Sequence, residues 1–156
     1  MSESHRSAGN VRRAALDYLA AHHVVTIATP EPWAAAVFYV NEGFTLYFVS
    51  SPRSRHAGHF GRDTRVAATI QEDYSDWRAI KGIQLEGNVR EVETTRVAAV
   101  RALYAAKFPV IADSAPGMRA VAEALARIHW YELRPAALYF IDNARGFGHR
   151  DVVELA

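Results

Sequence analysis

The sequence predicts an α+β fold in which flanking helices surround a small antiparallel β-barrel. Two observations lead to this class. Apolar residues follow a helical period up to about residue 22, and then a β-branched or alternating pattern up to about residue 92. Short turns join the strand-like runs, which favours antiparallel pairs over the longer crossovers that a parallel sheet needs.

The composition is that of one ordinary domain spanning residues 1–156. Half of the 156 residues are hydrophobic, enough for a core that needs neither disulfides nor a structural metal. The chain has no cysteine, which excludes disulfide scaffolds, Cys-ligated zinc, iron–sulfur clusters and thiol catalysis.

The first element is a helix over about residues 10–22, with Asn10 as its N-cap. Strand-like runs follow at residues 23–29, 33–40, 44–50, 65–71 and 77–92. Gly82 and Gly87 interrupt the last run, where we expect bends or bulges of the kind that barrels need at corners.

The second half of the chain adds helices and returns to strand. We predict helices over about residues 95–107, capped by Thr94 or Thr95, and over 115–128. A strand at 136–142 and a further extended segment at 150–155 complete the fold.

Charge and hydropathy exclude several classes of partner. The chain carries 18 basic and 17 acidic residues, so it lacks the basic excess typical of nucleic-acid and acidic-membrane binding. No run of about 18 apolar residues is present, and the polar N-terminus has no apolar segment behind it. We therefore expect a cytoplasmic protein with no nucleic-acid or membrane partner.

The densest cationic segment covers residues 51–65. Four arginines oppose one aspartate there, a net charge of +3 with histidine neutral. Ser54 can cap a short helix beside Arg55 and His56, and such a helix start with arginine suits a phosphate monoester. The alternative interpretation is a solvated, arginine-rich loop.

The motifs in and around this segment have a familiar order. Residues 48–50 (Phe-Val-Ser), 54–56 (Ser-Arg-His), 63–67 (Asp-Thr-Arg-Val-Ala) and 81–87 (Lys-Gly-Ile-Gln-Leu-Glu-Gly) resemble the pyridoxamine 5′-phosphate oxidase-like superfamily, as do Arg134-Pro135 and residues 138–140. Residues 80–87, 107–110 and 142–148 are most similar to its YhbP-like branch. The resemblance implies an antiparallel split β-barrel of the FMN-binding type.

The resemblance also implies a flavoprotein, most simply an FMN-dependent oxidoreductase of unknown substrate, and a homodimer with the cofactor between its subunits. The implied cofactor contacts are Val49, Ser50, Ser54, Arg55, His56, Lys81, Gln84, Arg145 and Arg150. His56 stands where the oxidases have lysine, which makes the phosphate contact titratable. The flavin-contacting glutamine of the oxidases falls at Gly82, and Gln84 shares its strand face. Gln84 on a solvated face, and Arg145 and Arg150 as surface charge, are the alternatives.

The C-terminal segment departs from the vitamin B6 oxidases. Ile141 stands near their tryptophan, and residues 145–150 (Arg-Gly-Phe-Gly-His-Arg) replace their closing arginine–histidine motif, so pyridoxamine phosphate oxidation is not expected. A non-enzymatic FMN or haem carrier or sensor, a deazaflavin protein, and a barrel that has lost its cofactor stay open as alternatives. His22-His23 and the His56/His59 pair lack carboxylates at metal-ligand spacing, so we expect no metal site.

Overall fold

The computed structural model describes residues 3–109 and 127–156, with side chains from residue 8 onward. Seven strands, three helices and two short 3₁₀ turns make up this part of the chain. In chain order they are α1 Glu3–Ala21, β1 Val24–Thr29, β2 Trp33–Glu42, β3 Thr45–Ser50, α2 Arg55–Phe60, β4 Arg65–Gln71, η1 Trp77–Ala79, β5 Lys81–Glu91, α3 Thr94–Lys107, β6 His129–Asp142, η2 Asn143–Arg145 and β7 Arg150–Val152.

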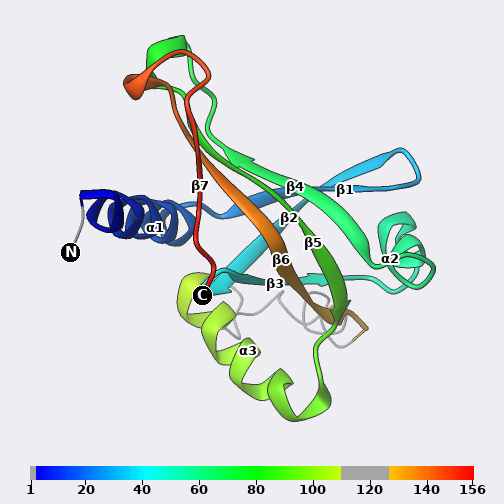
Figure 1. The fold of residues 1–156 in the computed structure, drawn as a ribbon. Helices are drawn as coiled ribbons and strands as arrows, with labels where there is room; N and C mark the ends of the chain where they lie inside the picture. The colour runs from blue at the N-terminus through cyan, green and yellow to red at the C-terminus, as the bar shows by residue number, and fades with distance from the viewer. Residues whose placement is uncertain (1–2, 110–126) are drawn as a thin grey trace.

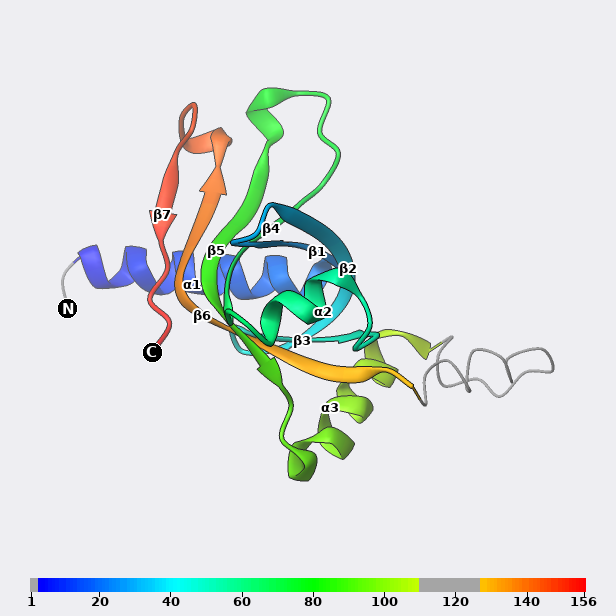
Figure 2. The ribbon, with the colours of Figure 1, turned by 90° about the vertical axis from the view of Figure 1, so that its right-hand side faces the viewer.

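The strands form one antiparallel sheet that closes on itself. Their order is β3-β2-β1-β4-β5-β6-β7, and a further pairing of β3 with β6 closes the first six into a barrel (Figures 1 and 2). The predicted class, an α+β antiparallel barrel with flanking helices, is confirmed.

The barrel is split beside the end of β3. β2 pairs with β3 only between Tyr39–Glu42 and Thr45–Phe48. Beyond this hairpin β2 continues along β1, while β3 continues along the start of β6, where Ser50 lies opposite His129. The two strands therefore separate next to α2, which begins five residues after Ser50.

The core fills the barrel and extends under α1. Alternate residues of the strands point inward, as two-residue periodicity requires, and Tyr39, Phe48 and Leu133 are fully buried. Ala15 and Leu19 of α1 join this core. A second cluster lies on the outer side of β2 and β3, where α3 covers it; its buried members are Val40, Tyr47, Val92, Val100 and Tyr104.

A β-bulge lies where β5 pairs with β6, and Ala136 of β6 is the extra residue. The register shifts between Glu86 and Gly87, which confirms a bulge at the second predicted glycine. A Cβ at Gly87 would lie 2.3 Å from the carbonyl oxygen of Arg134, so only glycine allows the two strands to approach this closely. At Gly82 the register continues without a shift.

Several predicted boundaries are wrong. α1 begins at Glu3, so Asn10 lies inside the helix and does not cap it. α3 begins at Thr94 with Glu93 in the N-cap position and no side-chain cap, because the helix starts one residue before the expected site. Residues 77–79 form the turn η1 before β5 begins.

The C-terminal half also differs from its prediction. β6 begins at His129, seven residues before the predicted start, because pairing with β3 and β5 keeps the polar stretch around Glu132 and Arg134 in the sheet. The short β7 confirms an extended segment only over its first residues. Most of the predicted helix 115–128 lies outside the described residues, and residues 127–128 are not helical. No helix in the described ranges is long and apolar enough to cross a membrane.

Candidate functional site

Three polar side chains converge where β3 ends beside the split. Ser50 Oγ lies 2.6 Å from His56 Nε2 and 2.9 Å from Ser54 Oγ, and Ser54 Oγ lies 3.2 Å from the same ring nitrogen. Ser54 also accepts a hydrogen bond from the Ala57 amide, which confirms it as the N-cap of α2. We call Ser50, Ser54 and His56 the hydroxyl–imidazole cluster.

The environment of the cluster favours a neutral imidazole. Ser50 is 8% exposed and His56 is half-buried. Burial lowers the pKa of His56 from its ordinary value, and the nearby His59 lowers it further. An anion placed against the ring would reverse this effect, because it favours the protonated form.

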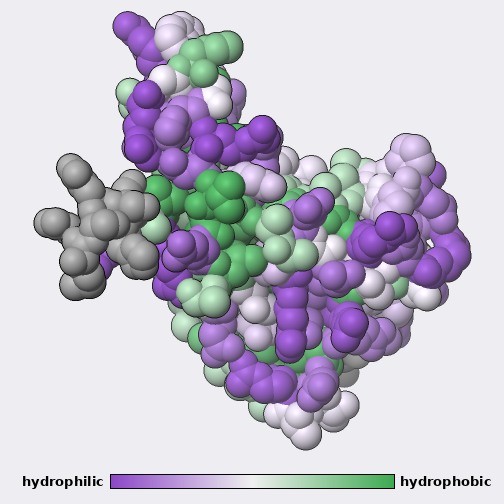
Figure 3. Space-filling view, viewed as in Figure 1, coloured by the Kyte–Doolittle hydropathy of each residue, from purple (hydrophilic) through white to green (hydrophobic). Residues whose placement is uncertain are grey.

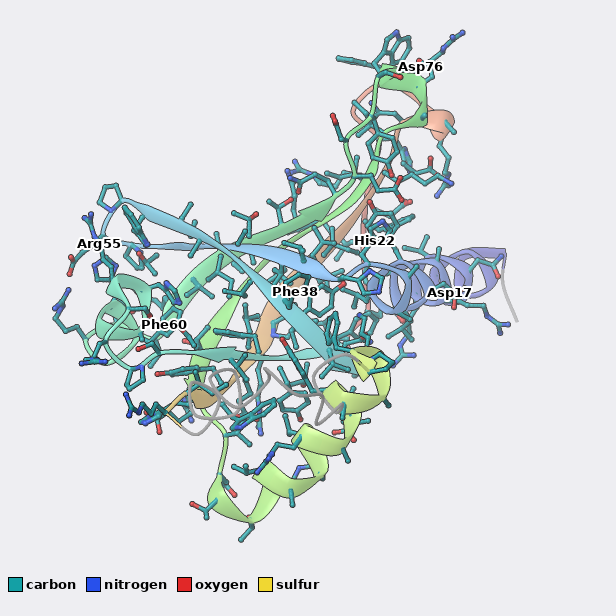
Figure 4. All side chains as sticks on the ribbon, turned by 180° about the vertical axis from the view of Figure 1, so that it is seen from behind. Asp17, His22, Phe38, Arg55, Phe60 and Asp76 are labelled. Atoms are coloured by element: carbon teal, nitrogen blue, oxygen red, sulfur yellow. The ribbon has the colours of Figure 1, made fainter. Side chains whose placement is uncertain are left out.

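Arg55 lies between Ser54 and His56 in the chain and supplies a positive charge. Its guanidinium lies over the ring of Trp33, 4.4 Å from the ring centroid, at the tip of the β1–β2 hairpin (Figure 4). No carboxylate within the described residues pairs with Arg55. Stacking on Trp33 orients the guanidinium while leaving its N–H donors free for an oxyanion.

Ion pairs neutralise part of the net charge of +3 carried by residues 51–65. Arg62 donates two hydrogen bonds to one carboxylate oxygen of Glu31, and Arg65 donates to both carboxylate oxygens of Asp63. Over the described ranges Arg53 and Arg55 are the two arginines of residues 51–65 without an acidic partner. Two of the four arginines are therefore neutralised by carboxylates, whereas Arg53 and Arg55 keep their charge available.

Two histidines outside the predicted cofactor contacts lie at this end of the barrel. His59 is 5% exposed and ties α2 to the β1–β2 hairpin through Thr29 Oγ1 at 2.7 Å and Glu31 Oε2 at 3.1 Å. His129 lies opposite Ser50 in the β3–β6 register, and its Nδ1 lies 2.9 Å from Glu91 Oε1. The pairing of β3 with β6 could not be predicted from local patterns, whereas the spacing of His56 and His59 on a short helix was visible.

The other predicted site residues lie at the opposite end of β6. Arg150 Nη1 donates to Gln84 Oε1 at 3.1 Å and its guanidinium packs over Tyr139, 5.3 Å from the ring centroid. Arg145 binds Asp151 at 2.6 Å, and Lys81 starts β5 nearby. We call Gln84, Tyr139 and Arg150 the amide–guanidinium cluster.

One chain does not bring the two clusters together. Ser50 pairs with His129 and Gln84 pairs with Tyr139, ten residues further along β6. At the rise of a β-strand this spacing is about 30 Å.

Val49 differs from its neighbours in the predicted set. It packs against the cluster under α3, on the strand face opposite Ser50. Only its backbone is placed to reach a ligand held by Ser50.

An open groove of about 510 Å³ lies elsewhere, over the outer faces of β1, β4 and β5. Small residues such as Ala28, Ala67 and Gly87 form its floor, with Arg65 and Glu86 at its edges. None of the predicted site residues lines it. Within residues 3–109 and 127–156, no group of three or more potential metal-ligating side chains occurs.

Comparisons with known proteins agree with this architecture. The family model described as pyridoxamine 5′-phosphate oxidase matches residues 11–142. A UPF0306 protein of Enterobacter is 33% identical over 139 residues, covering 85% of this chain and 89% of that protein. The UPF0306 protein YhbP of Salmonella paratyphi C is 32% identical over 138 residues, with 85% and 86% of the two chains covered.

Solved structures share the fold at lower identity. A haem-binding protein of Mycobacterium smegmatis matches with a TM-score of 0.69 and 22% identity over 94% of this chain, which spans only 57% of that one. HutZ, a haem storage protein of Vibrio cholerae, matches at 0.65 and 16% identity, covering 82% and 92%. An FAD-binding protein of Mesorhizobium loti matches at 0.63 and 15% identity, covering 81% and 90%. From the family match and the relatives above 30% identity, the chain belongs to the pyridoxamine 5′-phosphate oxidase family, and within it to the YhbP-like proteins.

Proposed function

We propose that the protein is an FMN-binding flavoprotein and an oxidoreductase. One observation carries the proposal: Ser50, Ser54 and His56 converge at the split in the barrel, and Arg55, which lies between Ser54 and His56 in the chain, has no ion-pair partner in the described residues. A phosphate monoester needs several donors from one side, and this is such a set. Family membership and the FAD-binding relative of known structure support a flavin as the bearer of that phosphate.

The side chains fit the phosphate in number and in kind. The hydroxyls of Ser50 and Ser54 are 2.9 Å apart, so both can turn their protons toward one oxyanion. Arg55 adds a permanent charge, and His56 adds a donor whose protonation an anion would favour. When bound, the flavin supplies the hydride or electron chemistry, and these residues hold and orient it.

The proposal includes a homodimer with the cofactor between its subunits. The amide–guanidinium cluster lies about 30 Å from the hydroxyl–imidazole cluster along β6, so one cofactor meets both only if they come from two chains. The outer faces of β1, β2 and β4 offer small residues for such a contact, among them Ala28, Ala34 and Ala67. Val24 and Phe38, 42% and 56% exposed, extend this apolar surface.

The same proposal places the protein in the cytoplasm, with a small-molecule substrate and no nucleic-acid or membrane partner. The near-neutral net charge of +1 supports this part. The absence of the B6 oxidases' closing arginine–histidine pattern argues for a substrate other than pyridoxamine phosphate.

Haem carriage is the second candidate, and His129 favours it. Its Nδ1 faces Glu91, while its Nε2 has no hydrogen-bond partner in the described part of the chain. A histidine held by a carboxylate at one nitrogen and open at the other is arranged as iron ligands are. Two of the solved relatives are haem-binding or haem storage proteins.

The absorption spectrum of the purified protein after incubation with FMN tests the proposal. We expect a bound-flavin spectrum that Arg55→Ala abolishes and that Arg53→Ala, an exposed arginine of the same loop, leaves intact. A Soret band after hemin addition that is lost in His129→Ala would replace the flavin by the haem candidate. A protein that retains neither cofactor contradicts both, and a strict monomer in gel filtration contradicts the shared site.

A further inference from the structure

The helix α2 bridges the split between β3 and the β1–β2 hairpin (Figure 1). On the β3 side, its N-cap Ser54 and the side chain of His56 contact Ser50 at 2.9 Å and 2.6 Å. On the hairpin side, the next polar residue of the helix, His59, reaches Thr29 at the end of β1. The geometry of the hydroxyl–imidazole cluster therefore depends on how α2 is held at the hairpin.

His59 is the polar side chain that holds α2 at the hairpin. It is 5% exposed, its Nδ1 lies 2.7 Å from Thr29 Oγ1, and its Nε2 lies 3.1 Å from Glu31 Oε2. Thr29 Oγ1 also donates to the Glu31 carbonyl oxygen at 2.7 Å, which fixes the hydroxyl within the hairpin turn. These contacts favour one position of the imidazole, because turning the ring away would leave buried polar groups unpaired.

Glu31 is in turn fastened to the chain that follows α2. Its Oε1 accepts from Arg62 Nε at 3.1 Å and from Arg62 Nη2 at 2.6 Å, and the Arg62 amide donates to the His59 carbonyl oxygen at 3.0 Å. The hydrogen bonds from Arg62 hold the pKa of Glu31 below its ordinary value, and the neighbouring His59 lowers it further. One ionised carboxylate thus links the tip of the hairpin to α2 and to the residues after it.

The apolar contacts of α2 do not fix its orientation by themselves. Phe60 packs against Phe48 and Tyr131, with ring centroids 6.1 Å and 5.6 Å away. Such contacts hold the helix against the core, but the hydrophobic effect has no direction. α2 is only six residues long, so the helix itself adds little stiffness. The directional contacts of His59 therefore decide how α2 is rotated about its axis.

The surface around α2 suits a charged ligand. Figure 3 shows the end of the molecule that carries α2 and the tip of the hairpin, at the right of the view, as mainly hydrophilic. A phosphate that binds there must exchange its water shell for protein donors, which is favourable only when several donors converge on it. Binding of the phosphate therefore depends on the orientation of α2.

We propose that His59 is a positioning residue for the hydroxyl–imidazole cluster, and that it makes this cluster selective for a flavin that carries a phosphate over one that lacks it. The inference rests on the proposed function, since Ser54 and His56 aim their donors at the phosphate only in the orientation of α2 that His59 holds. A shift of these donors by about 1 Å would break their hydrogen bonds to an oxyanion. Riboflavin has the same ring system without the phosphate, so it makes no use of these donors.

Flavin fluorescence titrations with FMN and with riboflavin test the proposal. His59→Leu keeps a side chain of similar size and removes both polar contacts. We expect it to weaken FMN binding about tenfold and to leave riboflavin binding unchanged. His59→Asn restores a polar atom near the position of Nδ1, and its FMN affinity should recover to within about threefold of the wild type. His23→Leu, the same substitution at an exposed histidine just before β1, is the matched control and should leave both affinities unchanged.

Glu31→Ala provides a second variant that leaves the core undisturbed, because the Glu31 side chain is 55% exposed. Removal of a negative charge would by electrostatics alone tighten FMN binding, whereas loss of the link between the hairpin and α2 weakens it. We expect FMN binding to be weakened about threefold and riboflavin binding to be unchanged.

Four results would overturn the proposal: unchanged FMN affinity in His59→Leu, equal losses of FMN and riboflavin affinity in that variant, no recovery in His59→Asn, or tighter FMN binding in Glu31→Ala. The proposed function is read from the wild type, and a wild type that binds no FMN overturns both proposals. A wild type that binds FMN and an Arg55→Ala variant that does not, together with an unchanged His59→Leu variant, overturn only the positioning role.

Discussion

Three glycines in different surroundings provide a graded test of the barrel's packing. An alanine Cβ at Gly87 would lie 2.3 Å from the Arg134 carbonyl oxygen and 2.9 Å from the Pro135 Cα; at Gly82 it would lie 3.0 Å from the Ile70 carbonyl oxygen; at Gly58 it would meet nothing within 4 Å. Ordinary van der Waals contact begins at 3.4 Å. Gly87→Ala must therefore move β5 and β6 apart by about 1 Å, across backbone atoms that cannot rotate away.

The expected free-energy changes follow this order. Gly87→Ala should lower the free energy of unfolding by about 3 kcal/mol and Gly82→Ala by about 1 kcal/mol, since both overfill a close contact. Gly58→Ala lies inside the helix α2 and should raise stability by about 0.5 kcal/mol, because alanine loses less chain entropy.

Urea unfolding of the cofactor-free proteins, followed by far-UV circular dichroism, measures all three changes. A Gly87→Ala protein within ~0.5 kcal/mol of the wild type, or one more stable than Gly82→Ala, would refute the packing argument. Equal losses at Gly58 and Gly87 would show that the effect is general and not due to the strand crossing.

Three further outcomes are expected. His56→Lys replaces a neutral ring by a permanent cation and should tighten FMN binding about tenfold at about pH 8. The wild-type affinity for FMN should fall as the pH rises from about 5.5 to 8, because the imidazole loses its proton. Equal FMN affinities of the two proteins in a flavin fluorescence titration would contradict the placement of the phosphate at His56. Burial lowers the pKa of Lys107 to about 8 from 10.5, so the unfolded chain binds more protons between these values and stability should rise with pH over this window; Lys107→Met should flatten that rise in urea midpoints. Asn143→Ala removes the acceptor of the Gly148 amide and should abolish the protection of that amide from hydrogen exchange. Unchanged protection of the Gly148 amide would show that the turn after η2 is held in another way.

Elements that depend on local patterns could be predicted from the sequence. The strand at residues 65–71 has the predicted bounds, and Ser54 caps α2 as expected, because both depend on neighbours within a few residues. The start of β6 could not be predicted in the same way. Residues 129–133 are held in the sheet by pairing with β3, about eighty positions earlier in the chain, and that pairing leaves no local signal.

In the candidate site, too, contacts between residues close in the sequence were predictable and contacts between distant residues were not. The contacts among Ser50, Ser54 and His56 span six residues or fewer, so sequence order indicated their proximity. The neutralisation of Arg62 by Glu31 spans 31 residues and could not be foreseen from a charge count. The distance between Ser50 and Gln84 depends on the closure of the barrel, which a resemblance implies only as a fold and not as a set of distances.

The length of β6 limits which sequence changes the protein can accept during evolution. One uninterrupted strand pairs with β3 at its beginning and with β7 at its end, so its length sets the spacing between the two halves of the candidate site. Inserting or deleting a single residue between His129 and Tyr139 would turn every later side chain of β6 to the opposite face of the sheet. It would also shift η2 and β7 by about 3 Å along the strand. Loops elsewhere can vary in length without changing this spacing. In β6, substitutions should be tolerated far better than insertions or deletions.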